Sequence, residues 1–111
     1  MAHDEALAEV LREDLSDEDG ITERKMFGGL CLMKNGHMIA GVHGAGGMMF
    51  RVGKPHEAEA MAIDGAGPME MTGRRMGGFI DVVDPEALAD DKRRRRWLHL
   101  ALDHAATLPP K

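Results

Sequence analysis

A single cysteine, Cys31, and six histidines are the residues that could act as nucleophiles or bind a metal in this chain of 111 residues. Cys31 lies inside an apolar stretch that reads as a central strand, and buried cysteines usually behave as small hydrophobic side chains. The histidines have no ligand spacing, because His99 and His104 are five residues apart and would not share a helix face. The sequence therefore predicts no catalytic residue, no metal ligand and no cofactor.

Two glycine-rich stretches resemble phosphate-binding loops in glycine content. "GVHGAGG", residues 41–47, joins two apolar runs, whereas a nucleotide-binding loop lies between a strand and a helix or ends in Lys-Ser/Thr. We interpret it as a hairpin loop. An alternative function stays open, in which this loop and "GRRMGG", residues 73–78, bind a small ligand or a nucleic acid with Arg51, Arg74 and Arg75.

The sharpest polar feature is "DDKRRRRW", residues 90–97. On a helix, Asp90–Arg94 and Asp91–Arg95 would form acid-before-base pairs four residues apart, which is typical of a solvated helix face.

Helical phase modifies that interpretation. Counted from Trp97, it places Arg93 and Arg94 on the apolar side of the helix, where an unpaired charge is costly. We therefore expect these arginines either to overhang the core or to meet carboxylates of another element or another chain, with the acidic N-terminal helix as a candidate.

Charge is distributed unevenly along the chain. Residues 1–19 hold eight acids and one base, a net charge of −7, while the whole chain has a net charge of −5. This balance offers no broad basic surface, so direct nucleic-acid binding is not the expectation.

Length and composition predict one soluble globular domain over residues 1–111, since 43% of the residues are hydrophobic and 30% charged. No apolar run approaches the length of a membrane span, and the acidic start differs from a secretory signal, so we expect a cytoplasmic protein. With ten Met and few aromatic residues, the core is expected to be filled largely with Met and aliphatic side chains.

Periodicity and turn residues predict helices and strands in separate runs. The expected order is a helix over 4–14, an edge strand over 21–26, a hairpin around 35–36, a strand over 48–52, a helix over 55–63, strands over 69–72 and 79–83 joined by "GRRMGG", and a helical segment over 85–108 bent near 90–91. This order predicts an α+β fold: an antiparallel β-sheet, a meander plus a second hairpin, flanked by N-terminal, middle and C-terminal helices.

Asn35-Gly36 predicts a type I′ turn and so fixes the hairpin register. Leu32 is then opposite Ile39, and Cys31 opposite Ala40. Both faces of the hairpin are largely apolar, which predicts central strands of a covered sheet.

Several motifs follow one another in a characteristic order. They are "MFGG" (Met26, Phe27, Gly28 and Gly29), the apolar hairpin with a small residue at Ala40, "MMFRV" at 48–52 with Arg51, Pro68-Met69, "MGGF" at 76–79 with Gly77 and Gly78, Asp84-Pro85 at a helix start, and Trp97. Together they resemble the N-terminal domain of the TfoX family, bacterial regulators of natural competence also called Sxy. Leu30 and Met49 stand where aromatic residues are common in the family.

The resemblance implies an α+β fold similar to that of type III secretion chaperones, and a non-enzymatic role in transcription regulation. Longer members carry a second, helical C-terminal domain and have the cyclic-AMP receptor protein as a suspected partner. The resemblance supplies no catalytic residue. We therefore expect a protein-interaction module whose partner the sequence does not name.

The "MFGG" motif is interpreted as a fold signature that could also form a contact. Phe27 is expected to anchor the core, and Gly28 and Gly29 to allow a sharp turn or the close approach of another backbone. The candidate interaction residues are Met26, Phe27, Gly28, Gly29, Arg51, Gly77, Gly78, Arg93, Arg94 and Trp97. Exposed edge strands and the arginine turn also favour a homodimer.

Overall fold

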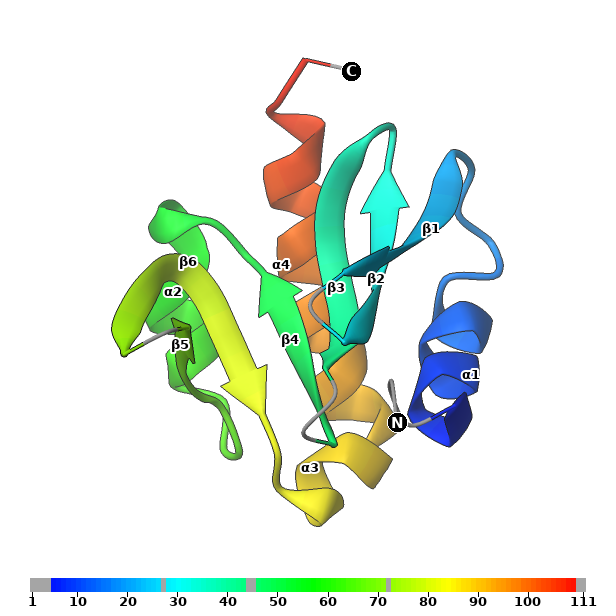
Figure 1. Cartoon of the computed structure of the whole chain (residues 1–111). Helices are drawn as coiled ribbons and strands as arrows, with labels where there is room; N and C mark the ends of the chain where they lie inside the picture. Colours follow the sequence, from blue (N-terminus) through cyan, green and yellow to red (C-terminus); the bar gives the residue numbers. More distant parts are fainter. Residues whose placement is uncertain (1–4, 27, 44–45, 72, 110–111) are drawn as a thin grey trace.

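The computed structural model describes residues 5–26, 28–43, 46–71 and 73–109, so the predictions made for Phe27 and for the centre of the 41–47 loop fall outside it. Six strands form one antiparallel sheet in the order β1-β2-β3-β4-β6-β5 (Figure 1). The strands are β1 (Ile21–Met26), β2 (Gly29–Lys34), β3 (His37–His43), β4 (Gly47–Arg51), β5 (Gly67–Met71) and β6 (Arg74–Val82). The helices are α1 (Glu5–Asp14), α2 (Lys54–Met61), α3 (Pro85–Ala89) and α4 (Asp91–Ala106). The predicted α+β fold, with a meander and a second hairpin, is confirmed.

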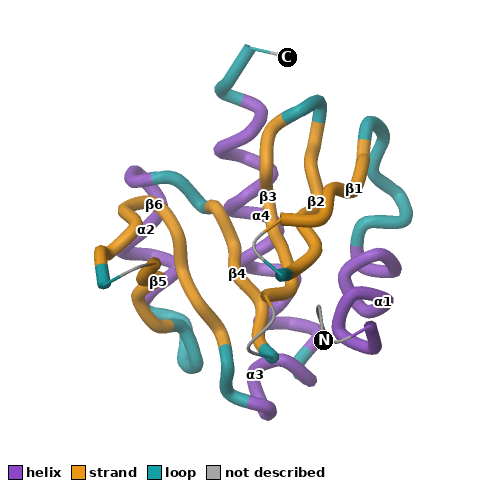
Figure 2. Tube along the Cα trace, viewed as in Figure 1, coloured by secondary structure: helices purple, strands orange, loops and turns teal. Residues whose placement is uncertain are grey.

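The helices pack on one face of the sheet, and the tube view shows α2 and α4 lying behind the strands (Figure 2). Each helix contributes buried side chains to one hydrophobic cluster, for example Leu11 from α1 and Leu88 from α3. None of the helices in the described ranges is long and apolar enough to cross a membrane.

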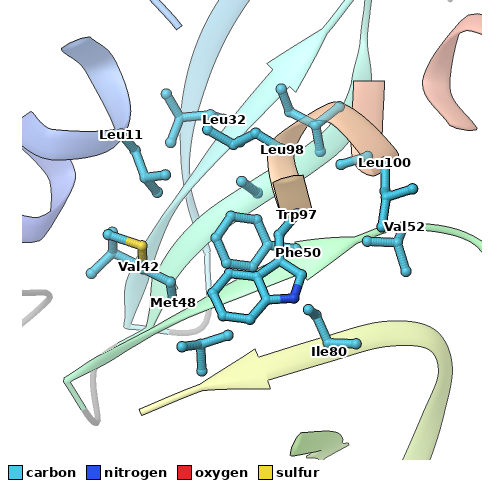
Figure 3. Close-up of a cluster of buried hydrophobic side chains, with 14 of the residues drawn as sticks. Leu11, Leu32, Val42, Met48, Phe50, Val52, Ile80, Trp97, Leu98 and Leu100 are labelled. Carbon is cyan, nitrogen blue, oxygen red and sulfur yellow. The ribbon is translucent and has the colours of Figure 1, made fainter. Parts of the chain in front are cut away.

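Trp97 lies in the middle of this core, as the close-up shows (Figure 3). Its ring centroid is 5.6 Å from that of Phe50, with the two planes tilted by 30°. Its indole Nε1 donates a hydrogen bond of 3.1 Å to the carbonyl oxygen of Ala60 in α2. Trp97 therefore joins α4 to both β4 and α2, and it is a structural residue rather than a surface contact.

The opposite face of the sheet carries a second, smaller cluster that is built from strand residues and is rich in sulfur. Its members are the buried Cys31, Met49 and Met69 and the partly buried Met26, Met33, Met38, Met76 and Phe79. As expected, the buried side chains are mostly aliphatic with some Met: Met48 lies in the main core, and Met49 and Met69 lie in this second cluster. Helices cover one face, and adaptable methionines shield the other face of the sheet.

The predicted hairpin register holds only next to the turn. Met33 pairs with Met38, but the register then shifts, so that Leu32 is opposite Ala40 and Cys31 opposite Gly41. The pairings predicted for Leu32 and Cys31 were wrong because Ile39 is an extra residue in β3, a β-bulge.

Two further boundaries differ from the prediction in the C-terminal half. "GRRMGG" is not a loop: residues 74–78 form the first part of β6, which pairs with β5. The long helix is broken rather than bent, because Asp90 ends α3 and its side chain caps the backbone N–H groups of Lys92 and Arg93 at the start of α4. Asp84 caps α3 as predicted, accepting from the N–H of Glu86.

Candidate interaction groove between α1 and α3

The arginine turn at the start of α4 is anchored by a buried ion pair. Arg94 is 5% exposed, and its Nε donates a hydrogen bond of 2.9 Å to Oδ2 of Asp14, the last residue of α1. A second nitrogen donates to the carbonyl oxygen of Leu88 at 2.7 Å, and Arg94 also pairs with Asp91. The predicted carboxylate partner from the acidic N-terminal helix is confirmed.

These contacts keep Arg94 charged although it is buried. Burial lowers the pKa of its guanidinium, but the hydrogen bonds that it donates to Asp14 and Asp91 outweigh burial, so the net shift of the pKa is upward. A bidentate guanidinium held by carboxylates from two helices has little freedom to move. Arg94 therefore fixes α1 against α3 and α4.

Arg93 is satisfied locally instead. Its Nε lies 2.9 Å from a carboxylate oxygen of Asp90, and another of its nitrogens donates to the carbonyl oxygen of Asp64. The acid–base pairs of this turn are thus three residues apart, Asp90 with Arg93 and Asp91 with Arg94, and the predicted spacing of four was wrong.

A hollow lies beside the fixed pair and is lined by residues of α1 and α3. Its volume is about 540 Å³, within the range of about 300–1,000 Å³ that is usual for binding pockets. Its walls are mainly apolar: Leu7, Val10, Gly46, Val83, Pro85, Leu88 and Ala89, with Asp91 and Arg94 at one side. We call this hollow the apolar groove.

Val83 distinguishes the apolar groove from an ordinary surface hollow, because its hydrophobic side chain is exposed there. In the described ranges it is the one large hydrophobic residue that is exposed, at 59%. It directly follows the buried Val82, so the alternation of the strand turns its side chain away from the core. Sequence reasoning missed Val83, although the adjacent pair Val82-Val83 signals that one of the two valines faces away from the core.

A second hollow, of about 590 Å³, continues from the first, sharing Val10, Asp91 and Arg94 with it. Its lining is polar and mostly acidic: Glu13, Asp14, Ser16, Asp17, Asp91, Arg94 and Arg95. We call it the acidic hollow. An apolar and a charged half thus lie side by side on one surface.

The other predicted interaction residues do not converge on this surface. Met26 belongs to the sulfur-rich cluster, and Gly28 has a positive φ of 74° in the turn that follows. A Cβ on Gly29 would lie 2.4 Å from the carbonyl oxygen of Val42, so this glycine allows two backbones to approach closely. The predicted close approach is confirmed at Gly29.

Arg51, Gly77 and Gly78 lie at the other end of β4 and β6. Arg51 pairs with Phe79 in the register, and the backbone N–H of Gly78 donates to Glu57 at 2.9 Å. Glu57 also pairs with Arg75. Arg75 is one of the three arginines that the alternative function assigned to ligand binding, and a carboxylate of the same chain already holds it. Glu57 therefore links α2 to β6 through Gly78 and Arg75.

Cys31 and the histidines are the residues that the sequence offers as possible nucleophiles or metal ligands. Burial raises the pKa of the Cys31 thiol, which keeps it protonated and weakly nucleophilic. The described residues include no group of three His, Cys, Asp or Glu side chains that could hold a metal ion. His43 and Asp81 form a pair at 2.8 Å, which links β3 to β6.

Comparison with known proteins and with family models identifies the family of this chain. Neither the curated proteins nor the solved structures contain a match to this chain. The family model described as the TfoX N-terminal domain matches residues 13–105, which is most of the chain. This range includes the strands of the sheet, α2, α3 and nearly all of α4. The chain therefore belongs to the TfoX N-terminal domain family.

Proposed function

We propose that this chain is a non-enzymatic protein-interaction module that acts in transcription regulation in the bacterial cytoplasm. Its contact surface is the apolar groove, and its partner is another protein. Membership of the TfoX N-terminal domain family supports the regulatory part of this proposal.

The observation that carries the proposal is a rigid apolar groove with an exposed anchor. Val83 is 59% exposed in a groove whose other large apolar residues, Leu7, Val10 and Leu88, are at least partly buried. The buried Asp14–Arg94 pair holds α1 in place at its side. Preformed apolar grooves with a polar rim are usual features of protein–protein contacts.

A co-purification experiment tests the proposal. The tagged chain is expressed at native level in the source bacterium and purified together with bound proteins. We expect one partner in a fixed stoichiometric ratio, and its loss when Val83→Lys places a charge in the apolar groove. Ala106→Lys, which adds the same charge at an exposed position near the end of α4, is the matched control.

Two results would count against the proposal. A partner that is retained equally by Val83→Lys and Ala106→Lys would show that the groove is not the contact. Salt-dependent retention of the purified chain on DNA, without any protein partner, would support the alternative of nucleic-acid binding.

A further inference from the structure

The surface formed by the apolar groove and the acidic hollow has a definite charge pattern. The acidic hollow is lined by four carboxylates, those of Glu13, Asp14, Asp17 and Asp91, and by two guanidinium groups. Its lining therefore carries a formal charge of −4 + 2 = −2, next to a groove that is mainly apolar.

Part of this negative charge is already neutralised inside the molecule. Asp14 and Asp91 are paired with Arg94, as described above. Glu13 and Asp17, by contrast, are exposed and make no ion pair in the part of the chain that the structure describes. These two carboxylates are available to a partner.

The rest of α1 adds to the negative potential only moderately. Glu5 and Glu9 both pair with Arg12, which also lies 2.6 Å from Glu23 of β1. Unpaired acidic charge on this side of the molecule is therefore concentrated at the C-terminal end of α1, beside the apolar groove.

We infer that the occupant of this surface is an amphipathic basic segment of a second protein, and this inference rests on the proposed function. Its apolar side chains enter the groove against Val83 and Leu88, and its Lys or Arg side chains pair with Glu13 and Asp17. An amphipathic helix laid into a groove presents apolar and charged side chains at adjacent positions, as this surface requires. Charge complementarity of this kind raises the association rate and selects the partner.

A pair of synthetic helical peptides tests the inference on the purified chain. Both carry leucines on one face, and the opposite face is lysine in one peptide and glutamate in the other. Fluorescence anisotropy is expected to show binding of the lysine peptide that weakens as salt is added, and binding of the glutamate peptide that is about tenfold weaker or absent.

Variants show whether binding occurs at this surface. Val83→Lys is expected to weaken binding of the lysine peptide about tenfold or more, as for a central apolar anchor. Glu13→Gln with Asp17→Asn is expected to weaken it severalfold and to reduce its salt dependence. The matched control is Glu70→Gln with Asp103→Asn, which removes two exposed carboxylates outside both hollows and should leave binding unchanged. Thermal unfolding of each variant checks that it is folded.

Several outcomes would overturn the inference. Equal weakening by the two carboxylate pairs would mean general attraction to an acidic protein. Equal binding of both peptides would show that the partner needs no basic side chains. A homodimer that dissociates in Val83→Lys would show that the groove is occupied by a second copy of this chain. If the cellular partner depends on Val83 but the lysine peptide does not bind, the proposed function stands and the partner chemistry is wrong. If no partner depends on Val83, the proposed function itself fails.

Discussion

At the scale of single residues, the Asp14–Arg94 pair is the contact on which the groove depends. Both side chains are 6% exposed. Removing Arg94 leaves the Asp14 carboxylate buried without this partner, and removing Asp14 leaves the buried Arg94 with only the more exposed Asp91 as a carboxylate partner. The sequence predicted the need for such a partner, since the helical phase turned Arg94 toward the core. It could not fix which of the eight acids in residues 1–19 would provide it.

We predict that Asp14→Ala lowers the free energy of unfolding by about 3 kcal/mol, because the buried guanidinium of Arg94 loses its buried carboxylate and keeps only the exposed one of Asp91. The double variant Asp14→Leu with Arg94→Met should recover a large part of this loss. Urea denaturation of the single and double variants measures both effects. A loss below about 1 kcal/mol in Asp14→Ala would place the pair among ordinary surface ion pairs.

Substitutions of the two glycines of "MFGG" are expected to differ in how much stability they cost. A Cβ on Gly28 would meet no atom within 4 Å, so Gly28→Ala should cost only the strain of a positive φ, about 1–2 kcal/mol. Gly29→Ala would place its Cβ against the backbone of Val42 and should be clearly more destabilising. Denaturation midpoints of the two variants test this order, and the reverse order would refute the assignment of roles.

His104 is expected to make the stability of the folded chain depend on pH. Burial lowers the pKa of His104 from its ordinary value of 6.5, and the positive charges of Arg51, His56 and His37 lower it further. The unfolded chain therefore binds a proton at this residue more readily than the folded chain does. His104 contributes full stability above pH 6.5, and this contribution decreases as pH falls below that value.

The variant His104→Gln tests this sign. Its unfolding free energy should change less between pH 7 and pH 5 than that of the unchanged chain. His99→Gln, which alters an exposed histidine on the same helix, is the control. A steeper pH dependence in His104→Gln than in the unchanged chain would contradict the assignment.

At the scale of elements, the sequence predicted the order of strands and helices but not their local irregularities. Asn35-Gly36 correctly placed the hairpin, since a type I′ turn has strong local sequence requirements. Ile39, the bulged residue, is buried in the main hydrophobic cluster, and the turn sequence contains no information about that packing.

The break between α3 and α4 has the same kind of explanation. A sequence of helix-forming residues around Asp90 predicts continuous helix, but Asp90 has an extended backbone and caps α4 with its side chain. Asp90→Ala should therefore lower the unfolding free energy by about 1 kcal/mol through loss of the cap. Asp103→Ala, within the body of α4, is the control, and an equal loss in both variants would refute capping.

The groove could be predicted only in part. Its ion pair followed from the helical phase of Arg94, whereas its apolar wall combines residues from α1, α3 and the end of β6. Such a surface arises from tertiary packing, and no single stretch of sequence describes it.

At the scale of the whole molecule, the expected homodimer now depends on the edge strands. Arg93 and Arg94 are satisfied within the chain, so these two arginines are not available to a second copy. The middle of β1 is exposed and charged, which opposes edge-to-edge pairing. We therefore expect self-association to be weak and visible only at high concentration by light scattering. Monomer mass at every concentration would rule the homodimer out.

Photo-crosslinking in the organism that encodes the chain tests whether the groove between α1 and α3 binds a second protein. A photoreactive amino acid is introduced at Val83 or, as a control, at Ala106. We expect one defined crosslinked protein at position 83 that is absent at position 106 and is reduced by Glu13→Gln with Asp17→Asn. Crosslinks that are equally abundant at both positions, or absent at position 83 in cells where the chain is folded and expressed, would contradict it.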